Sequence, residues 1–167
     1  MQKSSKKEFS QLIEKHQGII HKITMFYASN TNDREDLFQE ICLQLWKSYP
    51  NFRHEAKFST WMYRVALNTA IGNIRKNKDI PGFVQLSGND KVADDRTEEI
   101  EQVKLLYQSI SKLNRIDKAI ILLWLEEKSY DEIATIIGIT TSNVGVKLVR
   151  IKQKLEALVA KSERTAL

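Results

Sequence analysis

Residues 129–144 read SYDEIATIIGITTSNV and predict a short helix, a tight turn and the start of a second helix. Ser129, followed three residues later by Glu132, matches a capping box that starts the first helix. Its expected apolar face consists of Ile133, Ala134 and Ile137. Gly138 supplies the positive φ with which many helices end. A pair this short, with a basic helix in second place, is typical of a helix-turn-helix that enters a DNA groove.

The second helix of the pair, from Thr141 to about residue 156, carries two parallel stripes. The apolar stripe consists of Val144, Leu148, Ile151 and Leu155. One residue earlier, what we call the basic ridge repeats the same spacing at Asn143, Lys147, Arg150 and Lys154. Arg and Lys reach phosphates or guanine edges and Asn pairs with adenine, so we favour DNA contact. The alternative is an ordinary amphipathic surface helix.

The charge of the chain is unevenly spread over its 167 residues, which suit one or two small domains. The net charge of +5 divides into +6 for residues 1–78, −5 for residues 79–101 and +4 for residues 102–167. Two basic lobes joined by an acidic segment suggest a polyanion bound at two places. A solvated surface alone could also produce this pattern.

Cysteine and histidine usage predicts neither a disulfide framework nor a metal site. Cys42 is the single cysteine, inside an apolar helical pattern, and we expect it to be a core residue. His16, His21 and His54 have no metal-ligand spacing. A polar N-terminus and the absence of an 18-residue apolar run predict no membrane insertion and a reducing, cytoplasmic setting. We expect no cofactor.

Helical periodicity predicts an all-α fold without strands, made of two small helical domains at residues 1–78 and 98–167. Beyond the helix-turn-helix, helices are expected at about 9–28, 33–48, 58–78, 97–110 and 115–127. Asn32 and Asn114 are the expected N-caps of the second and fifth, and Pro50 should end the second. The apolar run 120–125 should be buried on most sides. Residues 79–97 contain Pro81, two glycines and several aspartates, and they read as an acidic linker.

The third predicted helix mixes aromatic and basic residues. Aromatic faces stack on unpaired bases, and the loop 51–57 before this helix could cradle an extruded base. The alternative is a plain core stripe of Phe58, Trp61, Met62 and Val65, which we favour for Trp61. For the polar residues along the helix we favour nucleic-acid contact; these are Arg64, Asn68, Arg75 and Lys76.

The second predicted helix is acidic. Asp33, Glu35, Asp36 and Glu40 cluster near its start, where acids favour the positive end of the helix dipole. Asp36, Gln39 and Glu40 share one face. An acidic face cannot bind DNA, because both are negatively charged. Periodicity therefore leaves two interpretations open, a solvated surface or a docking face for a positively charged protein.

Three segments in series resemble the extracytoplasmic-function group of bacterial RNA polymerase sigma factors in the sigma-70 family. They are residues 33–46, residues 58–68 and residues 113–155. The resemblance implies that the first lobe is sigma region 2 and docks on the β′ coiled coil of core RNA polymerase. The implied docking residues are Asp33, Asp36, Leu37, Gln39 and Glu40. Gly72, Asn114, Gly145 and Val149 depart from residues that are usual in the group.

The resemblance also implies two DNA sites. The minus-10 element would be recognised and melted by Phe52, Arg53, His54, Lys57, Trp61, Arg64, Asn68, Arg75 and Lys76. The minus-35 element would be read by Thr141, Ser142, Asn143, Lys147, Arg150 and Lys154 of a region 4 lobe, which also meets the β flap. The linker would thread toward the RNA exit channel, and an anti-sigma factor would control the protein. No catalytic residue is implied.

Two other classes of protein compete with this interpretation. A free-standing transcriptional regulator would use the second lobe for duplex DNA and the first for sensing or dimerisation. The acidic second helix and the aromatic third helix argue against a free-standing regulator. An enzyme is a more distant alternative, because the chain has no glycine-rich phosphate loop or nucleophile motif.

Overall fold

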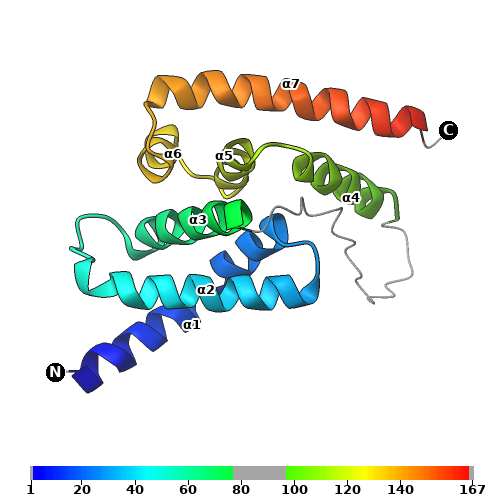
Figure 1. The fold of residues 1–167 in the computed structure, drawn as a ribbon. Helices are drawn as coiled ribbons and strands as arrows, with labels where there is room; N and C mark the ends of the chain where they lie inside the picture. Colours follow the sequence, from blue (N-terminus) through cyan, green and yellow to red (C-terminus); the bar gives the residue numbers. More distant parts are fainter. Residues whose placement is uncertain (1, 77–96, 166–167) are drawn as a thin grey trace. The chain divides into compact units, whose positions relative to one another are not determined.

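Helices are the regular elements of the part of the chain that the computed structural model describes, residues 2–76 and 97–165 (Figure 1). Its elements are α1 (Gln2–Tyr27), α2 (Thr31–Ser48), the short 3-10 helix η1 (Tyr49–Asn51), α3 (Phe58–Lys76), α4 (Thr97–Ser111), α5 (Arg115–Leu125), α6 (Tyr130–Ile137) and α7 (Thr141–Thr165). The predicted all-α class is confirmed. The chain divides into two compact units, Met1–Gly82 and Phe83–Leu167. Except for Thr97, the predicted linker 79–97 lies outside the described residues.

The first unit is a bundle of α1, α2 and α3, each packed against the other two. Its buried side chains come from all three helices, so one apolar core holds them together. The most deeply buried large residues are Ile20, Ile23, Leu37, Ile41, Leu45, Met62, Tyr63 and Leu67.

The start of α2 differs from the sequence prediction by two residues. The N-cap is Asn30 and not Asn32, because Asn30 has the extended backbone of a cap while Asn32 already lies in the helix. The Asn30 Oδ1 accepts a hydrogen bond from the Asp33 backbone N–H at 2.8 Å, and its Nδ2 donates to Asp33 Oδ2 at 2.9 Å. The helix ends at Ser48, before Pro50, as predicted.

Two further features of the first unit differ from the prediction. Helix α1 begins at Gln2 and not near Phe9, because the polar residues before Phe9 include good helix formers that need no core partner. On α3, Met62 is fully buried, but Phe58, Trp61 and Val65 are only half-buried. The core face of α3 is instead completed by Tyr63, Ala66, Leu67 and Ala70.

The second unit packs α5 between apolar neighbours from α6 and α7, and α4 lies against α7. Asn114 caps α5 as predicted. Residues 120–123 are buried, but Trp124 and Leu125 are 37 % and 41 % exposed, so the prediction that the whole run is buried was wrong at its end. The reason is that α5 stops at Leu125, two residues early, and the chain turns away through Glu127 with a φ of 59°.

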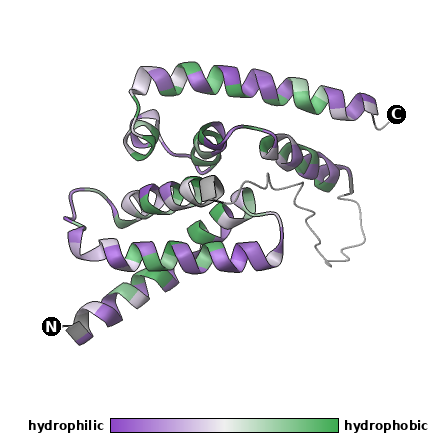
Figure 2. Cartoon of the chain, in the orientation of Figure 1, coloured by the Kyte–Doolittle hydropathy of each residue, from purple (hydrophilic) through white to green (hydrophobic). Residues whose placement is uncertain are grey.

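The helix-turn-helix is formed by α6 and α7, which meet at a bend of 98°. Both hydrogen bonds of the Ser129–Glu132 capping box are present, and Gly138 has the predicted positive φ, at 83°. On α6 it is Ile136 that is buried, whereas Ile137 is only half-buried. The predicted apolar stripe of α7 is confirmed, since its four residues are all buried. Figure 2 shows hydrophobic and hydrophilic residues alternating along α7, the pattern of an amphipathic helix.

No single helix within residues 2–76 and 97–165 is long and apolar enough to cross a membrane. In the same described residues, one bent pair, α6 and α7, passes that test when the two helices are counted together.

Candidate nucleic-acid interfaces

The basic ridge lies along α7, beside the buried stripe. Asn143 and Arg150 are exposed and Lys147 is half-buried. The ridge starts where α7 is fixed to α6, because Thr141 Oγ1 donates a hydrogen bond to Asp131 Oδ1 at 2.9 Å. Ser142, next along the chain, is exposed. The structure therefore presents most of the predicted minus-35 residues on one helix, held in place by the turn.

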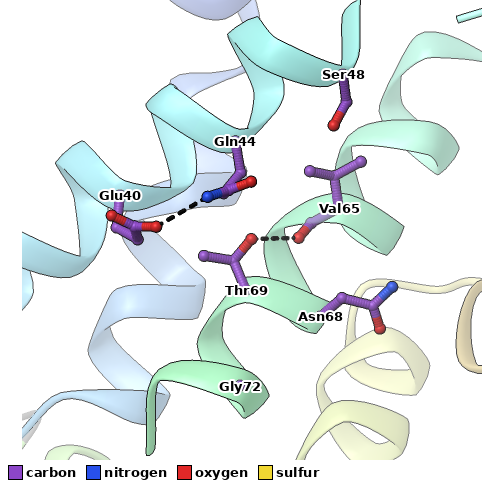
Figure 3. Close-up of a pocket in the computed structure, with 7 residues that line it drawn as sticks. All are labelled: Glu40, Gln44, Ser48, Val65, Asn68, Thr69 and Gly72. Carbon is purple, nitrogen blue, oxygen red and sulfur yellow. Dashed lines mark hydrogen bonds between the residues drawn. The ribbon is translucent and has the colours of Figure 1, made fainter. Parts of the chain in front are cut away.

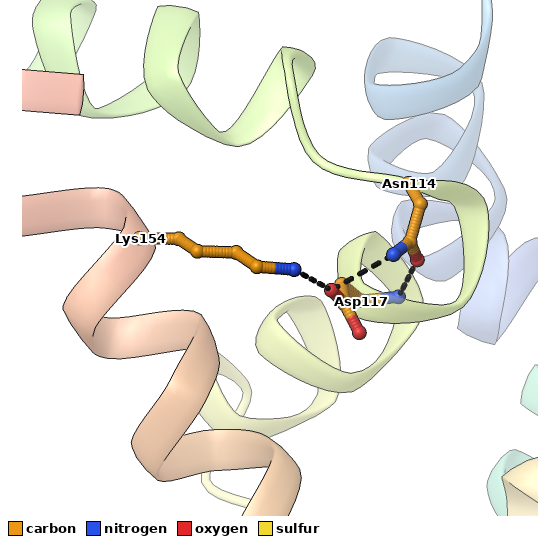
Figure 4. Close-up of polar contacts among 3 residues, drawn as sticks. All are labelled: Asn114, Asp117 and Lys154. Carbon is orange, nitrogen blue, oxygen red and sulfur yellow. Dashed lines mark hydrogen bonds and ion pairs between the residues drawn. The ribbon is translucent and has the colours of Figure 1, made fainter. Parts of the chain in front are cut away.

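Lys154, the last residue of the basic ridge, has a partner within the protein. Its Nζ lies 3.3 Å from Asp117 Oδ2, across from α7 to the first turn of α5 (Figure 4). The Asp117 side chain is 8 % exposed and that of Lys154 is 56 % exposed. The same carboxylate accepts a hydrogen bond from Asn114 Nδ2 at 2.9 Å. Lys154 thus ties the recognition helix to the N-terminus of α5, which sequence periodicity could not show.

We expect Lys154→Met to lower the free energy of unfolding by about 1 kcal/mol. Its aliphatic stem is kept, but the buried Asp117 carboxylate loses its cation. The measurement is the urea midpoint of the full chain. Lys161→Met is the matched control, because Lys161 is exposed further along α7. An unchanged midpoint, combined with a salt dependence of DNA binding lower by about one charge, would instead make Lys154 a simple phosphate contact.

The loop before α3 is backed by an aromatic cluster, which we define as Tyr49, Phe52, Phe58 and Trp61. The ring centroids of Phe52 lie 5.0 Å from Trp61 and 5.8 Å from Phe58, and Phe58 lies 5.4 Å from Trp61. These separations favour edge-to-face and tilted contacts. Trp61 is half-buried, so it supports the loop and keeps part of its surface accessible.

The loop itself is polar and holds one unusual backbone conformation. His54 has a φ of 58°, a left-handed geometry that few residues other than glycine adopt. Its ring packs against Phe52 with centroids 4.4 Å apart, which helps to hold that conformation. Arg53 and Lys57 flank it and are exposed. The loop next to the aromatic cluster is therefore exposed and carries the side chains of Arg53, His54 and Lys57.

Helix α3 continues the predicted minus-10 surface with Arg64 and Asn68, both exposed. Arg75 and Lys76 belong to its last turn, but their side chains lie outside the described residues. Asn68 also borders a groove of about 480 Å³ between α2 and α3 (Figure 3). No local sequence pattern predicts this groove, because its residues come from two helices. They are Glu40, Gln44, Ser48, Val65, Asn68, Thr69 and Gly72.

The acidic face of α2 is confirmed as a surface feature, with one correction. Asp36 and Gln39 are exposed, and Glu40 is half-buried and accepts a hydrogen bond from Gln44 Nε2 at 2.9 Å. Asp33 is exposed at the N-cap. Leu37 was predicted to be among the docking residues, but it is 1 % exposed and packs inside the bundle. A side chain this deeply buried cannot contact another protein while the three-helix bundle stays closed.

Leu43 is a surface residue of α2 that the sequence analysis missed. It is 44 % exposed and lies one turn after Gln39 and Glu40, on the same side of the helix as Asp36. Because Leu43 follows Gln39 by four residues, the helical spacing alone indicates that it lies on the acidic side of α2. We define the acidic face as Asp36, Gln39, Glu40 and Leu43.

Within the described residues, no group of three or more His, Cys, Asp or Glu side chains is placed to hold a metal ion. Cys42 is half-buried, and burial raises the pKa of its thiol.

Comparison with known proteins agrees with this arrangement. Residues 12–80 match the family described as Sigma-70 region 2, and residues 104–155 match Sigma-70, region 4. The chain is 25 % identical to the ECF RNA polymerase sigma factor SigW of Bacillus subtilis, covering 93 % of this chain and 90 % of that protein. It is 28 % identical to the ECF RNA polymerase sigma-E factor of Haemophilus influenzae, covering 93 % and 89 %.

Two solved structures share the fold. The sigma factor RpoE of Bartonella quintana, in complex with the anti-sigma factor NepR, superimposes with a TM-score of 0.72 at 17 % identity, covering 92 % of this chain and 98 % of that one. CnrH in complex with the cytosolic domain of CnrY gives a TM-score of 0.67 at 20 % identity, covering 93 % and 90 %.

A three-helix unit followed by a helix-turn-helix unit, each matching its sigma-70 region in order, defines a transcription initiation factor. The chain belongs to the sigma-70 family of RNA polymerase sigma factors. Within that family it is a member of the extracytoplasmic-function group.

Proposed function

We propose that this sigma factor docks on core RNA polymerase through the acidic face of α2 and recognises a promoter with both units. The observation that carries the proposal is the separation of charge. An acidic face lies on the three-helix unit, while a basic ridge lies on the second helix of the helix-turn-helix. A polyanion is repelled by the first surface and attracted by the second, so the two surfaces need different partners.

The partner proposed for the acidic face is the β′ coiled coil of the polymerase. A positively charged protein surface fits Asp36 and Glu40. Leu43 adds apolar area to the same face, and protein contacts usually combine an apolar centre with a polar rim. Residues 1–78 form the docking and minus-10 domain in this proposal, and residues 98–167 the minus-35 domain, which also meets the β flap.

For the minus-10 element we propose that the loop 52–57 receives a base flipped out of the non-template strand. Flipping costs a few kcal/mol, and stacking on an aromatic side chain returns about 1–3 kcal/mol per base. Phe52 and Trp61 supply that surface, and Arg53 and Lys57 lie where they can neutralise the strand. Arg64 and Asn68 extend the contact along α3.

For the minus-35 element we expect Arg150→Ala to weaken transcription about 10-fold to 100-fold. An arginine that reaches a guanine edge contributes roughly 1–3 kcal/mol of discrimination. The measurement is run-off transcription with reconstituted core polymerase on a promoter that has both elements. Arg164→Ala is the control, because Arg164 is exposed in the last turn of α7, beyond the helix-turn-helix. An equal loss on templates without a minus-35 element would show that Arg150 acts elsewhere.

Regulation and location complete the proposal. One of the two related structures is bound to an anti-sigma factor, and we extend this type of control to the present chain. The acidic linker, which lies outside the described residues, would approach the RNA exit channel. The protein would act in the cytoplasm, where the polymerase transcribes.

The test of the proposal as a whole is start-site choice. Purified protein added to core polymerase is expected to direct transcription from specific promoters, and mapping the 5′ ends gives their sequences. A free-standing regulator would instead occupy its operator tightly without the polymerase and leave start sites unchanged.

A further inference from the structure

Two valines on α7 are exposed where the fold gives them nothing to pack against. Val149 is 58 % exposed and Val146 is 51 % exposed, the highest values among the large hydrophobic residues of the described chain. Both lie inside α7, in its N-terminal half. Valine is a weaker helix former than lysine or glutamate, so helix propensity does not explain them.

Val146 and Val149 lie on the side of α7 that faces away from the core. With about 100° of rotation per residue, Val146 lies about 200° around the axis from the buried Val144, and Val149 about 140°. Arg150 is the next residue after Val149, and Ser142 lies one turn before Val146. Val146 thus lies about 40° around the axis from Arg150 of the basic ridge, and Val149 lies about 60° further round, on the side away from the ridge.

The surroundings of the valines favour nucleic acid over protein as their partner. The ridge of Asn143, Lys147 and Arg150 beside them is complementary to a polyanion. An apolar pair next to cations on the second helix of a helix-turn-helix is placed to enter the major groove.

Only one apolar group is displayed on base edges in the major groove, the C5-methyl of thymine. We propose that Val146 and Val149 read thymine methyl groups in the minus-35 element and so determine part of its sequence. This inference rests on the proposed function, because it requires α7 to enter the groove of that element. It predicts at least one A·T pair at the positions that α7 covers.

The test removes the methyl group and nothing else. Promoter duplexes are made with deoxyuridine in place of each thymidine of the minus-35 element, and binding of the reconstituted holoenzyme is measured. Burying one methyl group is worth about 0.8 kcal/mol, so each contacted thymine should give an approximately fourfold loss of affinity. Val146→Ala or Val149→Ala should weaken binding to thymine DNA similarly and abolish the effect of uracil at the matching position.

Val103→Ala is the matched control, because Val103 is 49 % exposed on α4. It should leave binding and the uracil effect unchanged. Replacing valine by alanine favours the helix, so loss of folding does not complicate the comparison.

The outcomes separate this inference from the proposed function. If the holoenzyme needs the minus-35 element but tolerates uracil at every position, the valines do not read thymine. The inference would also be overturned if each valine variant lost affinity for thymine DNA and for uracil DNA by the same factor, relative to the unchanged protein. That result would point to a protein partner for this face. If binding does not depend on the minus-35 element at all, the proposed function itself fails.

Discussion

Replacing Asp36 by lysine is expected to weaken binding of core polymerase by about 100-fold or more while leaving the fold intact. Asp36 is exposed in the acidic face of α2, past the first turn of the helix. A lysine there places like charges together at a positively charged partner surface, which costs several kcal/mol. The measurement is a pull-down of core polymerase, supported by a binding titration at physiological salt.

Glu14→Lys is the control for Asp36→Lys. It changes the net charge by the same amount, but Glu14 is exposed on α1 and does not belong to α2. It is expected to retain polymerase binding. Recovery of a normal complex with Asp36→Lys would remove the acidic face as the docking site. Equal loss with both variants would show that overall charge, and not this face, governs binding.

Unlike Asp36→Lys, Leu37→Ala is expected to act on the fold itself. It should lower the free energy of unfolding of the first unit by about 2–5 kcal/mol. Leu37 is adjacent to Asp36 but is 1 % exposed, among the buried side chains of the three-helix bundle. Truncation removes buried apolar contacts and leaves a cavity that the packed helices fill only in part. The measurement is the urea midpoint of the full chain, followed by tryptophan fluorescence in a Trp124→Phe background, in which Trp46 and Trp61 of this unit give the signal.

Leu43→Ala is the matched control for this prediction. It is the same substitution on the same helix, but Leu43 is 44 % exposed, so the urea midpoint should move little. Polymerase binding should fall, because Leu43 belongs to the acidic face. If Leu37→Ala left the midpoint unchanged, α2 would not pack as the structure shows.

The helix-turn-helix could be predicted in detail because local signals fix it. The capping box at Ser129 and Glu132, the positive φ of Gly138 and the buried stripe of α7 were all predicted from neighbouring residues. Each depends on spacings of three or four residues, which sequence displays directly. The N-cap Asn114 could be predicted for the same reason. At the start of α2, both Asn30 and Asn32 suit a cap, so local sequence did not distinguish them and the prediction named the wrong one.

The predicted sites were less complete, because a surface depends on more than one helix. The family resemblance included Leu37 among the docking residues, but the packing of three helices buries its side chain in the first unit. The groove between α2 and α3 joins Glu40 to Asn68, from helices separated by a loop. The aromatic cluster likewise combines η1 with α3.

The amino-acid sequence by itself determined that this chain is helical, that it ends in a helix-turn-helix, and which residues give α7 its basic ridge. Those properties follow from charge, caps and helical period, which are local. Only the tertiary structure decided that Lys154 pairs with Asp117, 37 residues earlier, and that Val146 and Val149 remain uncovered. Such contacts depend on which helices pack together, and that is set by the free energy of the whole core.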